Sequence, residues 1–221
     1  MHHASSTPTA LVLIDIQAGF KHPTYWGSSR STPTFESNVE KLLATVRKYN
    51  NTIDSSPASQ QRRPVLVLHV HHHSLSPTSA LHPSHYLEGS STPSVAPSPI
   101  AVPLASGSEP IFTKNFNSAF IGTELEATLR AAGIRQLIVV GLTTDHCVST
   151  TVRMAANLQV LGEDGGVDGN GVILVRDAVA TYEKGGFDAE TVHAVNLASL
   201  DGEFAKVVST EDVLADILGD V

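Results

Sequence analysis

The sequence predicts a three-layer α/β fold built on a doubly wound, mainly parallel sheet of six strands. Short apolar runs alternate along the chain with longer segments whose apolar residues recur at helical spacing. The apolar runs are nearly continuous, as expected of parallel strands that are covered on both faces. The chain has 221 residues, of which 41% are hydrophobic, so we expect a single domain over residues 1–221.

The first half of the chain predicts two strands, one helix and two long connections. Leu11–Ile14 is a short apolar strand, and Phe35–Tyr49 has the apolar spacing of an amphipathic helix. The polar stretch 51–63 predicts a surface loop before the second strand, Pro64–Val70. Residues 71–109 are rich in Ser, Pro and His. Because a long loop in a compact domain is usually functional, we expect this loop to cover an active site.

The second half of the chain alternates strands and helices more regularly. The expected strands are apolar runs at Ile111–Thr113, Gln136–Val140, Val172–Val175 and Ala205–Val208. The expected helices lie at Gly122–Ala132, Cys147–Leu158, Asp188–Leu200 and Thr210–Leu218. Gly133 is well placed to end the first of these helices. A Gly- and Asp-rich turn over 162–171 lacks the ordered acidic spacing of a calcium loop and predicts an insertion instead.

The only cysteine, Cys147, follows a buried strand and begins a segment with helical spacing. Unpaired backbone N–H groups and the helix dipole at such a position favour the thiolate, which is the nucleophilic form. A free cysteine can equally be a buried residue of the hydrophobic core. This segment alone does not separate the two interpretations.

Two other predicted strands end in charged residues, Asp15 and Lys114. The carboxyl ends of parallel strands share one edge of the sheet, where such folds place their chemistry. Alone, Asp15 would be a turn residue and Lys114 a solvated strand end. Together with Cys147 they can perform acyl transfer, in which the carboxylate takes the thiol proton, the ammonium stabilises both anions and the thiolate attacks.

These residues stand in segments that resemble the isochorismatase-like cysteine hydrolases. The resemblance spans nearly the whole chain; its segments are 13–17, 114–120, 141–148, 151–155 and 175–178. It implies the strand order 3-2-1-4-5-6 and the catalytic triad Asp15, Lys114 and Cys147. It also implies a cis peptide bond between Leu142 and Thr143, with an oxyanion hole made by the N–H groups of Thr143 and Cys147.

Three functions are compatible with this resemblance. The first is hydrolysis of a small amide or related C–N bond through a Cys147 thioester, with Asp15 as general base and acid. The second is isochorismatase-type cleavage of a vinyl ether, with Asp15 as general acid and no covalent thioester. The third is a catalytically silent interaction domain, against which the intact triad argues. The expected partners are a small-molecule substrate and, because family members are usually dimers or tetramers, further copies of the chain.

A histidine cluster follows the second strand, and alternation would place His69, His71 and His73 on one face. Imidazoles can bind zinc, and nicotinamidases, one branch of the family, hold a divalent metal near this place. Their motif contains an Asp two residues before a His, whereas this chain has no acidic residue between Asp54 and Glu88. We therefore expect no metal and no cofactor, and we expect His72 to line the substrate pocket as a hydrogen-bond donor.

Five further residues are candidates for substrate binding. Phe20, Trp26, Phe120 and Tyr182 could sandwich a planar substrate, although core packing is the simpler role for Phe120. Arg30 could pair with a substrate carboxylate, although a loop arginine is more often solvated. His146, beside the nucleophile, is assigned a structural or capping role.

Composition limits the cellular partners. The formal net charge is −8 and no basic run occurs, which disfavours nucleic acid. No apolar stretch approaches the length of a membrane helix, and residues 1–14 lack the pattern of a signal peptide. One cysteine cannot form an internal disulfide, which fits a cytoplasmic location, although signal-independent secretion is also compatible. Apolar residues of the long loop predict an oligomer contact; they are Leu75, Leu81, Tyr86 and Leu87.

Overall fold

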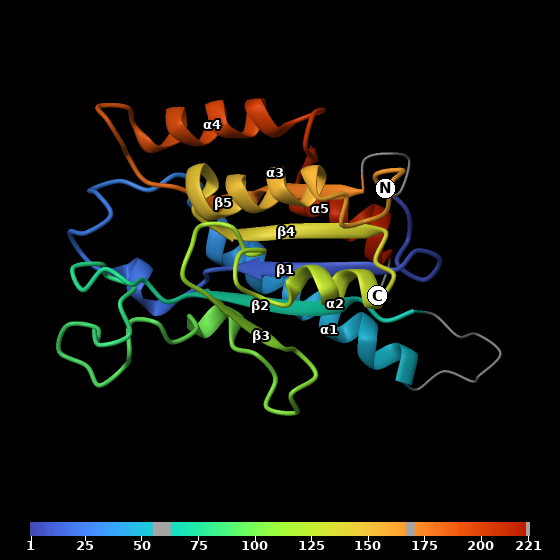
Figure 1. Ribbon diagram of the computed structural model, residues 1–221, viewed down its shortest axis with the longest axis horizontal. Helices are drawn as coiled ribbons and strands as arrows, with labels where there is room; N and C mark the ends of the chain where they lie inside the picture. Colours follow the sequence, from blue (N-terminus) through green and yellow to red (C-terminus); the bar gives the residue numbers. More distant parts are fainter. Residues whose placement is uncertain (55–62, 167–170, 220–221) are drawn as a thin grey trace.

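All strands of the sheet run in the same direction, in the order β3-β2-β1-β4-β5-β6 (Figure 1). The computed structural model describes residues 1–54, 63–166 and 171–219. The strands are β1 (Thr9–Ile14), β2 (Leu66–His72), β3 (Ile111–Lys114), β4 (Gln136–Leu142), β5 (Val172–Ala180) and β6 (Lys206–Val208). The expected six-stranded parallel sheet and its strand order are confirmed.

Helices cover both faces of the sheet (Figure 1). They are α1 (Phe35–Asp54), α2 (Leu125–Ala131), α3 (Ser149–Asn157), α4 (Ala189–Leu200) and α5 (Thr210–Val213), with short turns η1 (Ala18–Lys21), η3 (Pro99–Ala101), η4 (Thr144–Val148) and η6 (Leu214–Leu218). Helices α1 and α5 pack on one face, and α2 and α3 pack on the other, with α4 beside α3. No described helix combines the length and the apolarity that a bilayer-spanning segment requires.

The central strand β1 shows why its sequence is a continuous apolar run. Leu11 and Leu13 pack in the core on the α1 side, whereas Val12 and Ile14 pack in the core on the α3 side. Every residue of β1 is buried, because side chains that alternate in direction all meet a helical layer.

Helix α1 and strand β5 extend furthest beyond the bounds that the sequence predicts. Helix α1 continues to Asp54 and so takes in the first residues of the expected 51–63 loop, whose positions 55–62 lie outside the described residues. Strand β5 continues through Asp177, a polar residue that pattern reasoning excludes from a strand. The Asp177 carboxylate accepts hydrogen bonds from N–H and Oγ1 of Thr210, at 2.7 and 2.9 Å. Part of the expected 162–171 insertion, at 167–170, lies outside the described residues.

At Gly141, β4 leaves no room for a side chain against β1. A Cβ atom at this position would lie 2.0 Å from the carbonyl oxygen of Ile14, and Gly141 has a φ of +127°. Glycine therefore fits where a side chain does not. Asp15 directly follows β1 and has a φ of +53°, which turns the chain at the edge of the sheet.

The long connection between β2 and β3 folds back onto the segment that follows β1. Its backbone hydrogen bonds run from Ala18 N–H to Ala96, from Gly19 N–H to Ser94 and from Ser98 N–H to Ile16. Leu81 is buried, whereas Leu75 and Tyr86 are 70% and 60% exposed. The connection therefore covers the carboxyl edge of the sheet with one side and leaves apolar side chains in solvent, Leu75 and Tyr86 the most exposed among them.

Candidate active site

Three side chains converge at the carboxyl edge of the sheet. Asp15 follows β1, Lys114 ends β3, and Cys147 lies in η4 after β4. Lys114 Nζ donates a hydrogen bond to Asp15 Oδ2 at 2.7 Å and lies 3.3 Å from Cys147 Sγ. Asp15 and Lys114 are buried, and Cys147 is 9% exposed. The structure thus brings together the three residues that the sequence predicts at or directly after the ends of strands.

Burial opposes ionisation of the thiol. It raises the pKa of Cys147, and the Asp15 carboxylate raises this pKa further, with the Lys114 charge opposing both. Burial beside a carboxylate thus acts against the thiolate that a helix start favours. The helical segment also begins earlier than expected, at Thr144, so that Cys147 lies within a π-helical turn.

Asp15 is suited to accept the thiol proton. Burial raises the pKa of Asp15 by more than the Lys114 charge lowers it, which makes the carboxylate a stronger base than usual. Its Oδ1 atom has no hydrogen-bond partner among the described residues. A carboxylate oxygen of Asp15 lies within 4.8 Å of Cys147 Sγ.

His72 completes the surroundings of the ammonium group. Its Nδ1 atom lies 3.2 Å from Lys114 Nζ. Burial, followed by the Lys114 charge, lowers the pKa of His72 to about 4, so the neutral ring accepts a hydrogen bond at Nδ1. An ammonium group has three N–H donors. In this site they meet three acceptors, on Asp15, Cys147 and His72.

The same acceptors form a group of potential metal ligands. The ligand atoms of Asp15, His72 and Cys147 lie within 4.8 Å of one another. The Lys114 ammonium contacts all three and already supplies a positive charge at this place. A metal ion would have to displace that ammonium, so the donor set fits a lysine-centred site better than a metal centre.

The turn before the cysteine has the backbone that the family resemblance implies. The peptide bond between Leu142 and Thr143 is cis. The carbonyl oxygen of Thr143 accepts hydrogen bonds from the N–H groups of His146 and Val148, at 3.1 and 3.2 Å. Thr143 and Cys147 both line a cavity, and their N–H groups remain our candidates for the oxyanion hole.

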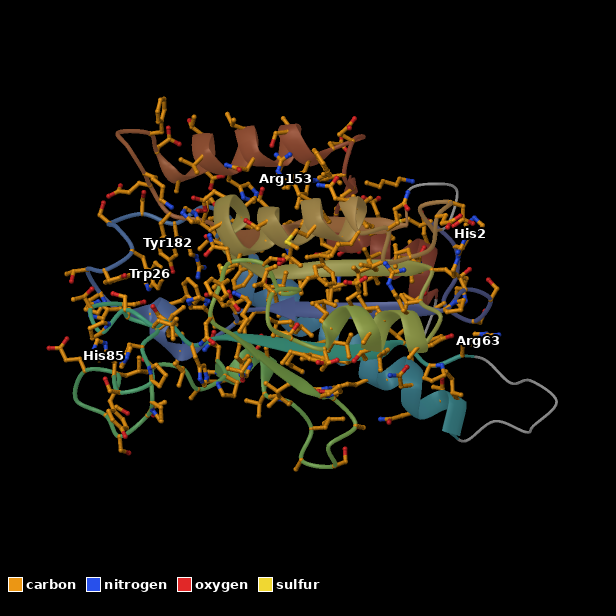
Figure 2. The ribbon with its side chains drawn as sticks, in the orientation of Figure 1. His2, Trp26, Arg63, His85, Arg153 and Tyr182 are labelled. Carbon is orange, nitrogen blue, oxygen red and sulfur yellow. The ribbon has the colours of Figure 1, made fainter. Side chains whose placement is uncertain are left out.

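This cavity has a volume of about 380 Å³ and opens beside Cys147. One wall is aromatic: the Trp26 ring stacks on Phe20 with centroids 4.4 Å apart and on Tyr182 with centroids 5.9 Å apart. Figure 2 shows Trp26 and Tyr182 at one end of the molecule, away from His2 and Arg63. Phe20, Trp26 and His72 thus lie where the sequence placed substrate-binding residues.

Trp26 and Tyr182 are held in place by hydrogen bonds to backbone. Trp26 Nε1 donates to the carbonyl oxygen of Gly19 at 2.9 Å, and the Tyr182 hydroxyl donates to the carbonyl oxygen of Phe20 at 2.8 Å. The polar atoms of both rings are therefore engaged by η1, which leaves ring surfaces for a ligand.

Two expected substrate-binding residues lie elsewhere. Both Nη atoms of Arg30 bind the Glu36 carboxylate at 2.6 Å, so its bidentate partner comes from α1 rather than from a substrate. Phe120 packs in the core beneath α2 and α3. Neither residue borders the cavity at Cys147. The sequence placed both near a strand end but could not show in which direction each side chain points.

His69 belongs to a hydrogen-bonded network with Glu109 and Arg47. Its Nε2 atom lies 3.1 Å from Glu109 Oε2, and Glu109 also accepts two hydrogen bonds from Arg47, at 2.8 and 2.6 Å. Burial lowers the pKa of His69 by more than Glu109 raises it. This network fastens the end of the long connection to α1 and β2.

The mouth of the cavity carries polar residues that the sequence did not reveal. Thr181 and Lys184, from the segment after β5, line it together with His146. All three contact the carboxylate of Asp145. Burial raises the pKa of Asp145, but hydrogen bonds from His146, Lys184 and Thr181 together lower it well below its ordinary value. The segment after β5 has no motif that would have marked it, and only the fold brings it to the cysteine turn.

Comparisons with known proteins agree on one family. A family model described as the isochorismatase domain matches residues 9–212. The chain is 35% identical over 211 residues to YrdC of Bacillus subtilis, described as an uncharacterized isochorismatase family protein, and the match covers 95% of this chain and 96% of YrdC. A crystal structure of a hydrolase of the isochorismatase family from Chromobacterium violaceum superposes with a TM-score of 0.77 at 34% identity, covering 100% of this chain and 98% of the other.

Shorter matches reach proteins that are named for a reaction. Nicotinamidase 3 of Arabidopsis thaliana is 30% identical over 113 residues, which cover 51% of this chain and 49% of the nicotinamidase. The ureidoacrylate amidohydrolase RutB of Variovorax paradoxus is 30% identical over 92 residues, which cover 42% of this chain and 32% of RutB. Both matches span half or less of the named enzymes.

Proposed function

Because this chain belongs to the isochorismatase family of hydrolases, we propose that it cleaves a small amide or a related C–N bond through a thioester on Cys147. One observation carries the proposal: the buried Lys114 ammonium contacts both Asp15 Oδ2 and Cys147 Sγ, at 2.7 and 3.3 Å. A base, a cation and a thiol in mutual contact are the groups that acyl transfer requires. The names of two amidohydrolase relatives support a C–N bond as the target.

The reaction begins with transfer of the thiol proton from Cys147 to Asp15. The thiolate then attacks the amide carbonyl carbon, and the N–H groups of Thr143 and Cys147 stabilise the negative charge on the carbonyl oxygen. The C–N bond breaks as Asp15 returns the proton to the leaving nitrogen, which departs as an amine or ammonia. A thioester remains on Cys147.

Water completes the cycle. Asp15, again a carboxylate, takes a proton from a water molecule that attacks the thioester carbonyl. The C–S bond breaks, the carboxylic acid leaves, and the proton on Asp15 returns to the Cys147 sulfur. The Lys114 ammonium contacts Asp15, His72 and Cys147, and its charge stabilises each anionic state of the reaction.

Intact-protein mass spectrometry tests the thioester. The wild-type protein, quenched in acid after mixing with a candidate amide, should gain the mass of the acyl group. Nicotinamide, an N-carbamoyl amino acid and fumaramate form a suitable first panel. The variant Cys147→Ala should gain no mass and should not release amine. Amine release that persists in Cys147→Ala would contradict the proposal.

A second candidate function has one specific observation in its favour. The raised pKa of Asp15 suits a general acid, which isochorismatase-type cleavage of a vinyl ether requires. This reaction does not need a covalent bond to sulfur. Isochorismate turnover that survives in Cys147→Ala but disappears in Asp15→Asn would favour the second candidate over the first.

A further inference from the structure

The mouth of the active-site cavity presents basic side chains to any bound molecule. Lys184 lines the mouth from the segment after β5, and 52% of its side chain is exposed. His146 lines it from η4, directly before the nucleophile, with 46% of its side chain exposed. Lys184 Nζ lies 3.1 Å from His146 Nδ1, so the two groups form one feature of the mouth.

The Asp145 carboxylate, which binds both Lys184 and His146, lies outside the lining of the cavity. Only 7% of the Asp145 side chain is exposed, and Asp145 does not line the cavity. Its Oδ1 atom accepts the Thr181 hydroxyl, and its Oδ2 atom lies 2.7 Å from both Lys184 Nζ and His146 Nδ1. Asp145 therefore fixes the two basic groups from behind and leaves their outer surfaces towards the ligand.

The charges around the cavity favour an anion. Its lining includes two basic side chains, His146 and Lys184, and none of the described lining residues carries a carboxylate. The other imidazole of the lining, that of His72, is neutral, because burial lowers its pKa to about 4. Deeper in the site, the opposite charges of Asp15 and Lys114 offset each other. A cavity lined by one sign of charge attracts ligands of the opposite sign.

We propose that the substrate is an anionic amide: a small, planar molecule whose scissile carbonyl lies at Cys147 and whose other end carries a carboxylate bound by Lys184 and His146. The stacked ring of Trp26 offers the apolar surface on which the planar part lies. This inference rests on the proposed amide hydrolysis and adds the substrate class. Lys184 is its specificity-determining residue, because it can donate charged hydrogen bonds to a carboxylate.

A matched pair of amides tests the role of the carboxylate. Fumaramate and crotonamide share a planar unsaturated amide, and fumaramate ends in a carboxylate where crotonamide ends in a methyl group. Trp26 is the only tryptophan of the chain and lines the cavity, so its fluorescence reports binding. Titrations in a Cys147→Ala background measure affinity without turnover. We expect fumaramate to bind about tenfold more tightly than crotonamide, the effect of one charged hydrogen-bonded contact.

Substitutions at Lys184 identify the group responsible. Lys184→Met should remove the preference for fumaramate and leave the affinity for crotonamide unchanged, which also shows that the cavity remains folded. Lys184→Arg should retain most of the preference. Lys41→Met is the matched control, because Lys41 is another half-exposed lysine paired with a carboxylate, that of Glu211. It should leave both affinities unchanged.

The outcomes separate this inference from the proposed function. Equal affinities for the two amides, absent binding of fumaramate, or a preference that survives in Lys184→Met would overturn the anionic substrate class. Acyl-adduct formation on wild-type Cys147 reports independently on the proposed chemistry, because the fluorescence titration requires no turnover.

Discussion

Lys114 Nζ lies 2.7 Å from Asp15 Oδ2, and both side chains have 0% solvent exposure. The two residues come from β3 and from the end of β1, strands that are separated in the sheet by β2. An ion pair buried this deeply is costly to desolvate, and the cost is offset only while both partners are present. We therefore expect the pair to which we assign activation of the thiol to contribute to stability as well.

Breaking this pair should affect both activity and folding. We expect Asp15→Asn to abolish turnover and to lower the free energy of unfolding by about 3 kcal/mol, because the lysine charge is left buried without its partner. Lys114→Met should cost a similar amount. The double variant Asp15→Asn/Lys114→Met should cost less than the sum of the two, since no uncompensated charge remains. Urea unfolding measures all three variants, and additive costs would argue against coupling.

The labelling rate of Cys147 should follow the charges around it. Burial and the Asp15 carboxylate raise the pKa of Cys147, so iodoacetamide should label the native protein at pH 7 more slowly than it labels glutathione. Asp15→Asn removes the anion and should accelerate labelling although it abolishes turnover. Lys114→Met should slow it further. A wild-type protein that reacts faster than Asp15→Asn would contradict this expectation.

His71 should make the protein less stable in acid. Burial, with smaller contributions from His69 and His73, lowers the pKa of His71 from 6.5 to about 4. Between these values the unfolded chain binds a proton that the native state does not, so the free energy of unfolding falls as pH decreases from 6.5 to 4. The variant His71→Leu should show a smaller fall, with His72 accounting for part of the remainder. Urea unfolding at pH 4.5, 5.5 and 7 gives the comparison, and an unchanged slope would contradict it.

Gly141 should tolerate no side chain. In Gly141→Ala the new Cβ would meet the Ile14 carbonyl at 2.0 Å, so strands β1 and β4 would have to separate at the centre of the sheet. We expect insoluble expression or a loss of stability above about 3 kcal/mol, in the range of severe core overpacking. Gly133→Ala is the matched control, because Gly133 also has a positive φ but an added Cβ there meets no atom within 4 Å. Similar thermal midpoints for the two variants would contradict this expectation.

The exposed apolar residues of the long connection should mark a contact between copies of the chain. Leu75 and Tyr86 are 70% and 60% exposed, and exposed apolar groups that gather on a surface often form an interface. We expect light scattering to give the mass of a homo-oligomer at micromolar concentration. The variant Leu75→Ser/Tyr86→Ser should shift that mass towards the monomer, whereas Phe187→Ser, at a 63% exposed position in the segment after β5, should not. A monomeric wild-type protein would refute the proposal.

The strands of the sheet and the charged residues at their ends could be predicted because their signals are local. Each buried strand is a continuous apolar run, and Asp15 and Lys114 are the charged residues at which two of these runs end. The order of strands then decides which ends meet. That order came from the family resemblance, since apolar runs alone do not specify which strands are neighbours.

The mouth of the cavity could not be predicted because it depends on side-chain direction. Arg30 and Lys184 both lie in polar loops near strand ends, yet Arg30 pairs with Glu36 of α1 and Lys184 pairs with Asp145 of η4. The protonation of Cys147 could not be predicted for a related reason. Its pKa depends on burial and on Asp15, and the sequence around the cysteine shows neither.

The position of β3 has a consequence for how the site could be lost. This strand has four residues, lies at the edge of the sheet and pairs only with β2 among the described strands. Edge elements exchange their amide hydrogens through small local openings that leave the remaining structure intact. Because Lys114 is the last residue of β3, such an opening would carry the lysine away from Asp15 and Cys147. The protein could thus become inactive while its central strands remain protected from exchange.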